Sequence, residues 1–224
     1  LGFDKENLYV AGLPYYKPEI KSHVEGITGV KAVTASNSYV TGNAGMTHAV
    51  AKDGISLTLK VRKVLPNYLD VVGIPLIAGE GFTDSNAGAL IVEDAMKDFG
   101  DDRKIQELIS QTNDYKFAGF SANTNSKPAT DMTVNDIEAY ANVGYDYQHL
   151  WFLIVRTEPN VNVKALTSQL KQTIVDTYQL DEETDVWSVD DEMTSRYARF
   201  KRQSLIFALF SIIAIIIALM GVFG

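Results

Sequence analysis

The chain has 224 residues, of which 46% are hydrophobic and 21% charged, so it can bury a sizeable core as one large domain or two small ones. Its 28 acidic and 20 basic side chains give a formal charge of −8 at pH 7, which argues against nucleic acid as a partner because such binding depends on neutralising phosphates. The absence of cysteine excludes disulfides, thiol catalysis and cysteine-based metal sites.

The first forty residues predict a strand, a helix and a second strand. Residues 7–13 form an apolar run of strand length, and Pro18 then stands where a helix tolerates proline, in its first turn. Apolar residues follow at helical spacing as far as Ile27, and residues 30–36 return to a strand pattern. These segments form a β-α-β unit.

A second β-α-β unit is predicted near the other end of the chain. Residues 150–155 are a short apolar run, residues 163–178 carry apolar side chains on one helical face, and residues 184–189 close the unit as a strand. Two such halves make the split β-α-β-β-α-β pattern, with both helices on one face of the sheet. The sequence therefore predicts an α+β fold with a discontinuous lobe formed by residues 1–40 and 150–191.

Residues 41–149 are predicted to form an inserted mixed α/β lobe. Residues 55–62 alternate apolar and polar side chains, the period of a half-buried strand. Residues 121–136 are polar and predict an irregular loop. The other elements expected in this lobe are a helical turn at 66–72, strands at 74–77 and 89–92, a bend at Gly79 and Gly81, and short helices at 93–99 and 105–109.

The C-terminal part predicts one long helix that enters a membrane. Ser188 and Asp191 have the spacing of a capping box, and no proline or glycine interrupts residues 192–220. Residues 204–224 contain no charge, and about 20 apolar residues span a bilayer as a helix. We expect both chain ends to be cuts in a longer membrane protein, since the chain does not begin with methionine and no residue follows the predicted span.

We expect the segment 192–224, the stalk and the start of the span, to couple the membrane to the preceding domain. An uninterrupted helix moves as a rod, because sharp bending needs proline, glycine or a bulge. Basic side chains just before the span can lie at the lipid headgroups, and aromatic ones can pack on the domain or on a partner helix. The predicted coupling residues are Glu192, Arg196, Tyr197, Arg199, Phe200 and Arg202.

The sequence carries no catalytic or cofactor motif. His23, His48 and His149 are scattered, and none has a metal-ligand spacing from another. The zinc-protease, nucleophile-elbow and phosphate-loop patterns do not occur. The acidic clusters at 181–185 and 190–192 are expected to be solvated turn and cap residues. We therefore predict a chain that is not an enzyme and holds no cofactor or metal, with any ATP bound by another domain or chain.

Several short segments carry a resemblance through their order and spacing. They are residues 1–8, 29–30 with 33–36, 67–79 with Phe82, 189–192 with Arg196, Tyr197 and Arg202, and 218–224. On these residues the chain resembles the FtsX-like permeases of ABC transporters and their MacB-type periplasmic core domain. Glu80 stands where that family commonly has arginine, and residues 117–120 are similar to one of its strands. The role of residues 101–149 is left open.

The resemblance implies a permease with four membrane spans in the inner membrane and this domain in the periplasm. It implies a porter-like lobe near the membrane and an inserted outer lobe. The implied partners are a separate nucleotide-binding ATPase subunit, a second permease in a homodimer or pair, the lipid bilayer, and a periplasmic or outer-membrane protein. Relatives expel peptides and drugs, extract lipoproteins or transmit force to cell-wall hydrolases, and the sequence does not choose among these roles.

A function of another class stays open at this point. A periplasmic ligand-sensing domain of a membrane signalling protein would also combine a folded lobe with a helix that carries a signal inward. A membrane-anchored enzyme is disfavoured by the missing motifs. The residues that follow Gly224 would discriminate, because further spans indicate a permease and a kinase module indicates a sensor.

Overall fold

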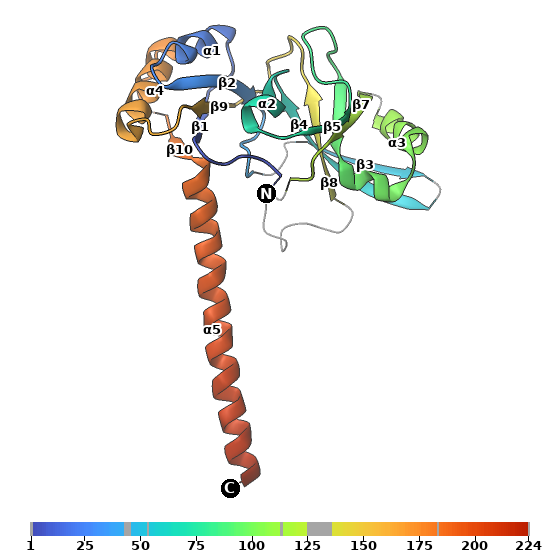
Figure 1. Cartoon of the computed structure of the whole chain (residues 1–224), viewed down its shortest axis with the longest axis vertical. Coiled ribbons are helices and arrows are strands. Elements are labelled where there is room, and N and C mark those ends of the chain that lie inside the picture. The colour runs from blue at the N-terminus through green and yellow to red at the C-terminus, as the bar shows by residue number, and fades with distance from the viewer. Residues whose placement is uncertain are drawn as a thin grey trace. The chain divides into compact units, whose positions relative to one another are not determined.

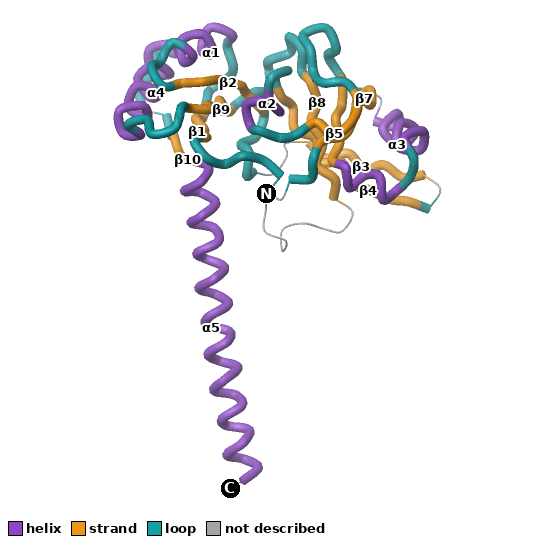
Figure 2. Tube along the Cα trace, viewed as in Figure 1, coloured by secondary structure: helices purple, strands orange, loops and turns teal. Residues whose placement is uncertain are grey.

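A computed structural model describes residues 2–42, 46–52, 54–112, 114–124, 136–182 and 184–223. The chain divides into two compact units, Leu1–Val189 and Asp190–Gly224, and each is described by itself. Figure 1 traces the chain in rainbow order, and Figure 2 distinguishes its helices from its strands.

The first unit is built on one mixed sheet, which within the described residues has ten strands in the order β10-β1-β9-β2-β4-β8-β6-β7-β5, with β3 paired to β4. The strands are β1 (Leu8–Gly12), β2 (Val30–Ser36), β3 (Met46–Lys52), β4 (Ile55–Val64), β5 (Leu76–Gly79), β6 (Ala89–Glu93), β7 (Lys116–Ser121), β8 (Asp136–Asn142), β9 (Phe152–Thr157) and β10 (Val186–Ser188).

The first part of the sheet has the split β-α-β-β-α-β arrangement that the sequence predicts. Strands β1 and β2 both run antiparallel to β9, which lies between them, and β10 pairs with the outer side of β1. Helices α1 (Pro18–Glu25) and α4 (Val163–Tyr178) pack against each other on one face of these strands (Figure 1). Pro18 starts α1, and the Asn162 side chain caps α4 by accepting a hydrogen bond from the Ala165 amide at 3.1 Å.

Apolar side chains from alternate strand positions and from the two helices form the core of this part. Each such side chain contributes roughly 1.5–3 kcal/mol when it leaves water, so the cluster fixes the helices on this face. Its fully buried members include Ile20, Val24, Val33, Leu153, Val155, Leu170 and Ile174.

The second part of the sheet carries its own core on the same face. Strands β4 and β8 are parallel, β8 and β6 antiparallel, and β6 and β7 parallel again. Helix α3 (Asp102–Ile109) covers this face, and the Asp101 side chain caps it by accepting from the Lys104 amide at 3.0 Å. The core residues include Leu57, Leu59, Val61, Leu90, Val92, Ile105, Leu108 and Ile137.

The two parts are continuous at Ser36 of β2, which pairs with Val64 of β4. Helix α2 (Tyr68–Val72) lies on the other face of the sheet, where it contacts β2 and β9 and stacks Tyr68 on Tyr140 of β8 with ring centroids 5.7 Å apart. The predicted division into a lobe of 1–40 with 150–191 and a lobe of 41–149 stays a prediction, since one sheet runs through both.

The sequence missed strands β3 and β8. Residues 136–142 alternate charged or polar side chains with Ile137, Ala139 and Ala141, and both faces of β8 are buried between β4 and β6. The prediction of a loop at 121–136 is wrong at its two end residues, because Ser121 is the last residue of β7 and Asp136 is the first residue of β8. Residues 125–135 of that loop lie outside the described residues. Residues 93–99 form a 3-10 helix, η1 (Asp94–Phe99), rather than an α-helix.

Helix α5 (Val189–Phe223) is a single helix, as the sequence predicts, and it begins directly after Ser188, the residue at which the predicted capping box starts. Large apolar side chains such as Phe207 and Phe210 are exposed on it. The membrane span predicted at 204–224 is not confirmed: within the described residues, no helix meets the length and hydropathy needed to cross a bilayer. The side chains of residues 216, 219 and 221–224 lie outside the described part of that segment.

Candidate functional site

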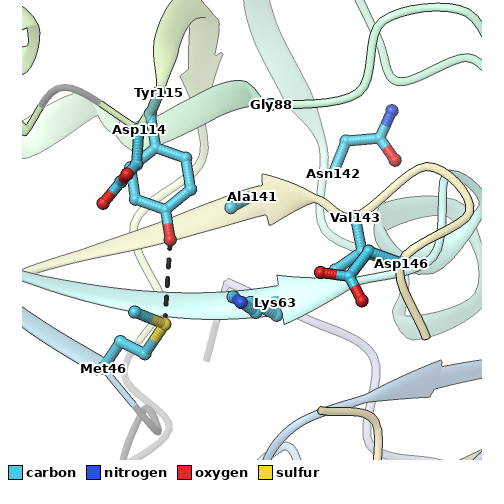
Figure 3. Close-up of a pocket in the computed structure, with 9 residues that line it drawn as sticks. All are labelled: Met46, Lys63, Gly88, Asp114, Tyr115, Ala141, Asn142, Val143 and Asp146. Carbon is cyan, nitrogen blue, oxygen red and sulfur yellow. Dashed lines mark hydrogen bonds between the residues drawn. The ribbon is translucent and has the colours of Figure 1, made fainter. Parts of the chain in front are cut away.

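A hollow of about 290 Å³ opens beside the ends of β4 and β8. Lys63, at the end of β4, pairs in register with the small residue Ala141 of β8, which leaves space above the strands. In Figure 3, Lys63 lies between Tyr115 on one side and Asp146 on the other. The hollow is also lined by Met46, Gly88, Asp114, Ala141, Asn142 and Val143.

The hollow offers both signs of charge. Lys63 is half-buried, and its side chain forms no ion pair with any residue that the structure describes. Asp146 accepts a long hydrogen bond of 3.4 Å from the Gln148 amide. The Tyr115 hydroxyl donates to the Met46 sulfur at 3.8 Å, and burial, with the nearby Asp114 carboxylate, raises the pKa of that phenol. This lining can bind a small polar ligand, but it pairs no nucleophile with a general base.

The sheet face under α2 buries a cluster of charges. Arg62 is 1% exposed and alternates with the core residue Val61, so its guanidinium points to the opposite face. Its Nη2 lies 3.7 Å from Oε2 of Glu138. The guanidinium also donates to the backbone carbonyls of residues 38–42, namely Ser38 at 2.9 Å, Tyr39 at 2.6 Å, Val40 at 3.5 Å and Gly42 at 3.2 Å.

A second buried acid, Glu93 at the end of β6, lies in the same cluster. Its Oε1 accepts two hydrogen bonds of 2.5 Å, from the amide and the hydroxyl of Thr124. Burial raises the pKa of Glu93 from 4.5 to about 7. No sequence pattern marked Arg62, Glu93 or Glu138, because their importance comes from partners that are distant in the sequence.

The N-terminal segment, residues 2–7, is held by Arg156 of β9. The guanidinium donates to the carbonyl oxygens of Asp4 at 2.9 Å, Glu6 at 2.5 Å and Val71 at 2.9 Å, and to the Asp4 carboxylate at 3.0 Å. The Asp4 amide in turn donates to the Val72 carbonyl at 3.2 Å. One side chain therefore ties the N-terminal segment to both β9 and the end of α2.

Of the six coupling residues predicted from the sequence, only Glu192 has a described side chain, and it lies in the first turn of α5. Its carbonyl accepts a hydrogen bond from the Ser195 hydroxyl at 2.8 Å. The side chains of Arg196, Tyr197, Arg199, Phe200 and Arg202 lie outside the described residues. Their coupling role stays a prediction. Among the described residues, no group of three or more histidine, aspartate or glutamate side chains is arranged to hold a metal.

Comparison with known proteins gives a likeness of structure but none of sequence. No family model and no curated protein matches the chain. The periplasmic region of MacB from Actinobacillus actinomycetemcomitans superposes with a TM-score of 0.56 at 11% identity, over 88% of this chain and 94% of that one. The extracellular domain of the noncanonical ABC-type transporter YknZ from Gram-positive bacteria superposes with a TM-score of 0.55 at 16% identity, over 80% of this chain and 98% of that one.

A domain of a Porphyromonas gingivalis protein described as a permease gives a TM-score of 0.55 at 16% identity, over 83% of this chain and 92% of that domain. All three matches cover at least 92% of the solved domains and at least 80% of this chain. The chain therefore has the fold of the periplasmic domain of MacB-type ABC permeases.

Proposed function

We propose that this chain is the extracytoplasmic domain of an ABC transporter permease subunit. The observation that supports this most strongly is the shared fold over 92–98% of three solved domains, all of them from transporters or permeases. At 11–16% identity that likeness concerns the fold, so the activity is an inference from it. In this function the domain performs no catalysis and acts by changing shape or by holding a partner.

The subunit would lie in the inner membrane with this domain on the periplasmic side. A separate ATPase subunit would supply the energy, in keeping with a sequence that has no phosphate-binding loop. A second permease, as a homodimer or a pair, and a periplasmic or outer-membrane protein would complete the assembly. The work done could be export, lipoprotein extraction or mechanotransmission, and all three require movement to pass between the membrane and this domain.

We expect that movement to pass along α5, which continues without proline or glycine from Val189 to Met220. Replacing Ala198 and Arg199 by two glycines should soften the helix, since each glycine costs about 1 kcal/mol of helix stability relative to alanine. In the full-length assembly, the stimulation of ATPase activity by substrate and the transport rate should fall at least about tenfold, whereas the thermal unfolding of the first unit should not change.

The matched control is Arg199→Ala, which removes the same charge and keeps a good helix former. This variant should retain coupled activity. Full transport in the double-glycine variant would show that α5 is only a tether, and equal losses in both variants would assign the effect to the charge instead of to the stiffness of the helix.

The hollow around Lys63 favours a second candidate, a ligand-sensing domain. A half-buried ammonium between a phenol and a carboxylate suits a small ligand that carries both charges. Titration with the dipeptide alanyl-alanine at millimolar concentration should then shift the amide NMR signals of Lys63, Tyr115 and Asp146. Lys63→Met should abolish the shifts, and Lys31→Met, at an exposed position of β2, should not. Unchanged spectra of the unsubstituted protein would remove this candidate.

A further inference from the structure

Glu93 is a buried titratable group that described elements contact. Its side chain is 3% exposed and lies between β8 and the segment 122–124 that follows β7. The neighbouring titratable groups are Glu138 and Tyr140 from β8, Arg62 from β4 and Tyr68 from α2, while Asp94 and Lys97 of η1 pair with each other nearby. Among the residues that the structure describes, the cluster thus contains the carboxyl groups of Glu93 and Glu138 and the guanidinium of Arg62.

The carboxyl group of Glu93 holds the segment 122–124 in place. One of its oxygens accepts hydrogen bonds from both the amide and the hydroxyl of Thr124. That hydroxyl lies 3.2 Å from the Tyr140 hydroxyl. The Asn123 side chain accepts from the Ala95 amide at 2.8 Å. Glu93 therefore accepts both hydrogen bonds of Thr124 at the end of this segment, while the Ala122 amide at its start donates to the Pro75 carbonyl at 2.8 Å.

The N-terminal segment packs directly on 122–124. A Cβ atom placed on Gly2 would lie 1.8 Å from the Asn123 carbonyl oxygen, so only glycine allows this approach, and Gly2 has a φ of +76°. Two residues later, Asp4 is bound by Arg156. A displacement of 122–124 would therefore disturb the contact that the N-terminal segment makes with the domain.

We propose that Glu93 is a proton-binding switch: as a neutral acid it keeps the segment 122–124 closed, and its ionisation favours an open form in which the carboxylate is hydrated. The physical reason is the charge balance of the cluster. Arg62 lies beside Glu138 and donates most of its hydrogen bonds to backbone carbonyls, so its single positive charge compensates at most one of the two buried carboxylates. A second buried negative charge lowers its free energy by reaching water.

The direction of the pH dependence follows from linkage. Burial is the largest cause of the raised pKa of Glu93, about 7 in the closed form against 4.5 in water; it outweighs the hydrogen bonds from Thr124, which lower the pKa, and the Glu138 carboxylate adds to it. The closed form therefore binds the proton more tightly than the open form does. Closure is fully favoured below about pH 4.5, weakens as the pH rises to about 7, and is constant above that value.

Hydrogen exchange of residues 122–124 and 2–4, measured on the whole chain and corrected for the intrinsic rate at each pH, tests this proposal. Protection should fall by up to about 100-fold between pH 5 and pH 7 and then level off. Glu93→Gln keeps the acceptor oxygen for Thr124 and cannot ionise, so its protection should be high and independent of pH. The control Glu107→Gln on α3 should behave like the unsubstituted chain.

Two outcomes would overturn the switch: protection of 122–124 that does not change from pH 5 to pH 7, or a Glu93→Gln chain that keeps the change. If Glu93→Gln does not fold, the ¹³C carboxyl signal of Glu93 in the unsubstituted chain decides the question. A titration midpoint near 4.5 would contradict the proposal, and one near 7 would support it.

Discussion

Replacing Arg62 by methionine is expected to lower the free energy of unfolding by about 3–5 kcal/mol, because it removes one partner of a buried ion pair and leaves the other charge uncompensated. The change also leaves the carbonyl oxygens of Ser38, Tyr39 and Gly42 without their donor in a buried site. Urea unfolding followed by circular dichroism measures the loss. Arg103→Met on α3, where the arginine side chain is 88% exposed, is the control and should change stability by less than about 0.5 kcal/mol.

A second substitution separates the two causes of this loss. Glu138→Gln, added to Arg62→Met, removes the uncompensated carboxylate but does not restore the donors to the 38–42 backbone. Part of the lost stability, about 1–2 kcal/mol, should therefore return in the double variant. A double variant no more stable than Arg62→Met would mean that the Glu138 carboxylate contributes nothing to the loss, and the loss would then come from the 38–42 backbone alone.

Replacing Arg156 by alanine is expected to cost about 2–3 kcal/mol and to release the N-terminal segment. This one guanidinium donates four hydrogen bonds. Hydrogen bonds from charged donors contribute roughly 1.5–3 kcal/mol each before solvent exposure is discounted. The measurable sign is faster hydrogen exchange of residues 2–7, together with a lower unfolding midpoint.

Asp4→Asn is the matched control for Arg156. Three of the four hydrogen bonds go to backbone carbonyls of Asp4, Glu6 and Val71, so the loss of the carboxylate removes only the ion pair at the exposed end. We expect this variant to lose less than about 1 kcal/mol. If Asp4→Asn were as damaging as Arg156→Ala, the charge pair and not the backbone contacts would hold the segment.

Arg156 also contacts the N-terminal segment that packs near the Glu93 cluster. It binds the N-terminal segment at Asp4, and that segment contacts Asn123 next to the Glu93 cluster. Comparing the exchange of 122–124 in the Arg156→Ala chain with that in the unsubstituted chain shows whether the two sites are linked.

The sequence by itself determined the elements that depend on local patterns. Helix α4 was predicted at its observed bounds of 163–178 because its apolar side chains recur on one face. The strands predicted at 30–36 and 89–92 correspond to β2 and β6, because short apolar runs between turn residues are typical of buried strands. The pairing of two β-α-β halves followed from these elements, and the resemblance to MacB-type domains agreed with them.

Only the tertiary structure decided where the charged residues matter. Strand β8 carries Glu138 on the face opposite its core residues Ile137, Ala139 and Ala141, and Arg62, from a strand far earlier in the chain, compensates this buried acid. Arg156 and Asp4 are 152 residues apart, and Glu93 and Thr124 are 31 apart. Hydrophobic periodicity is a property of neighbouring residues, whereas the pKa of a buried acid and the partners of a buried arginine depend on which distant segments the fold brings against them.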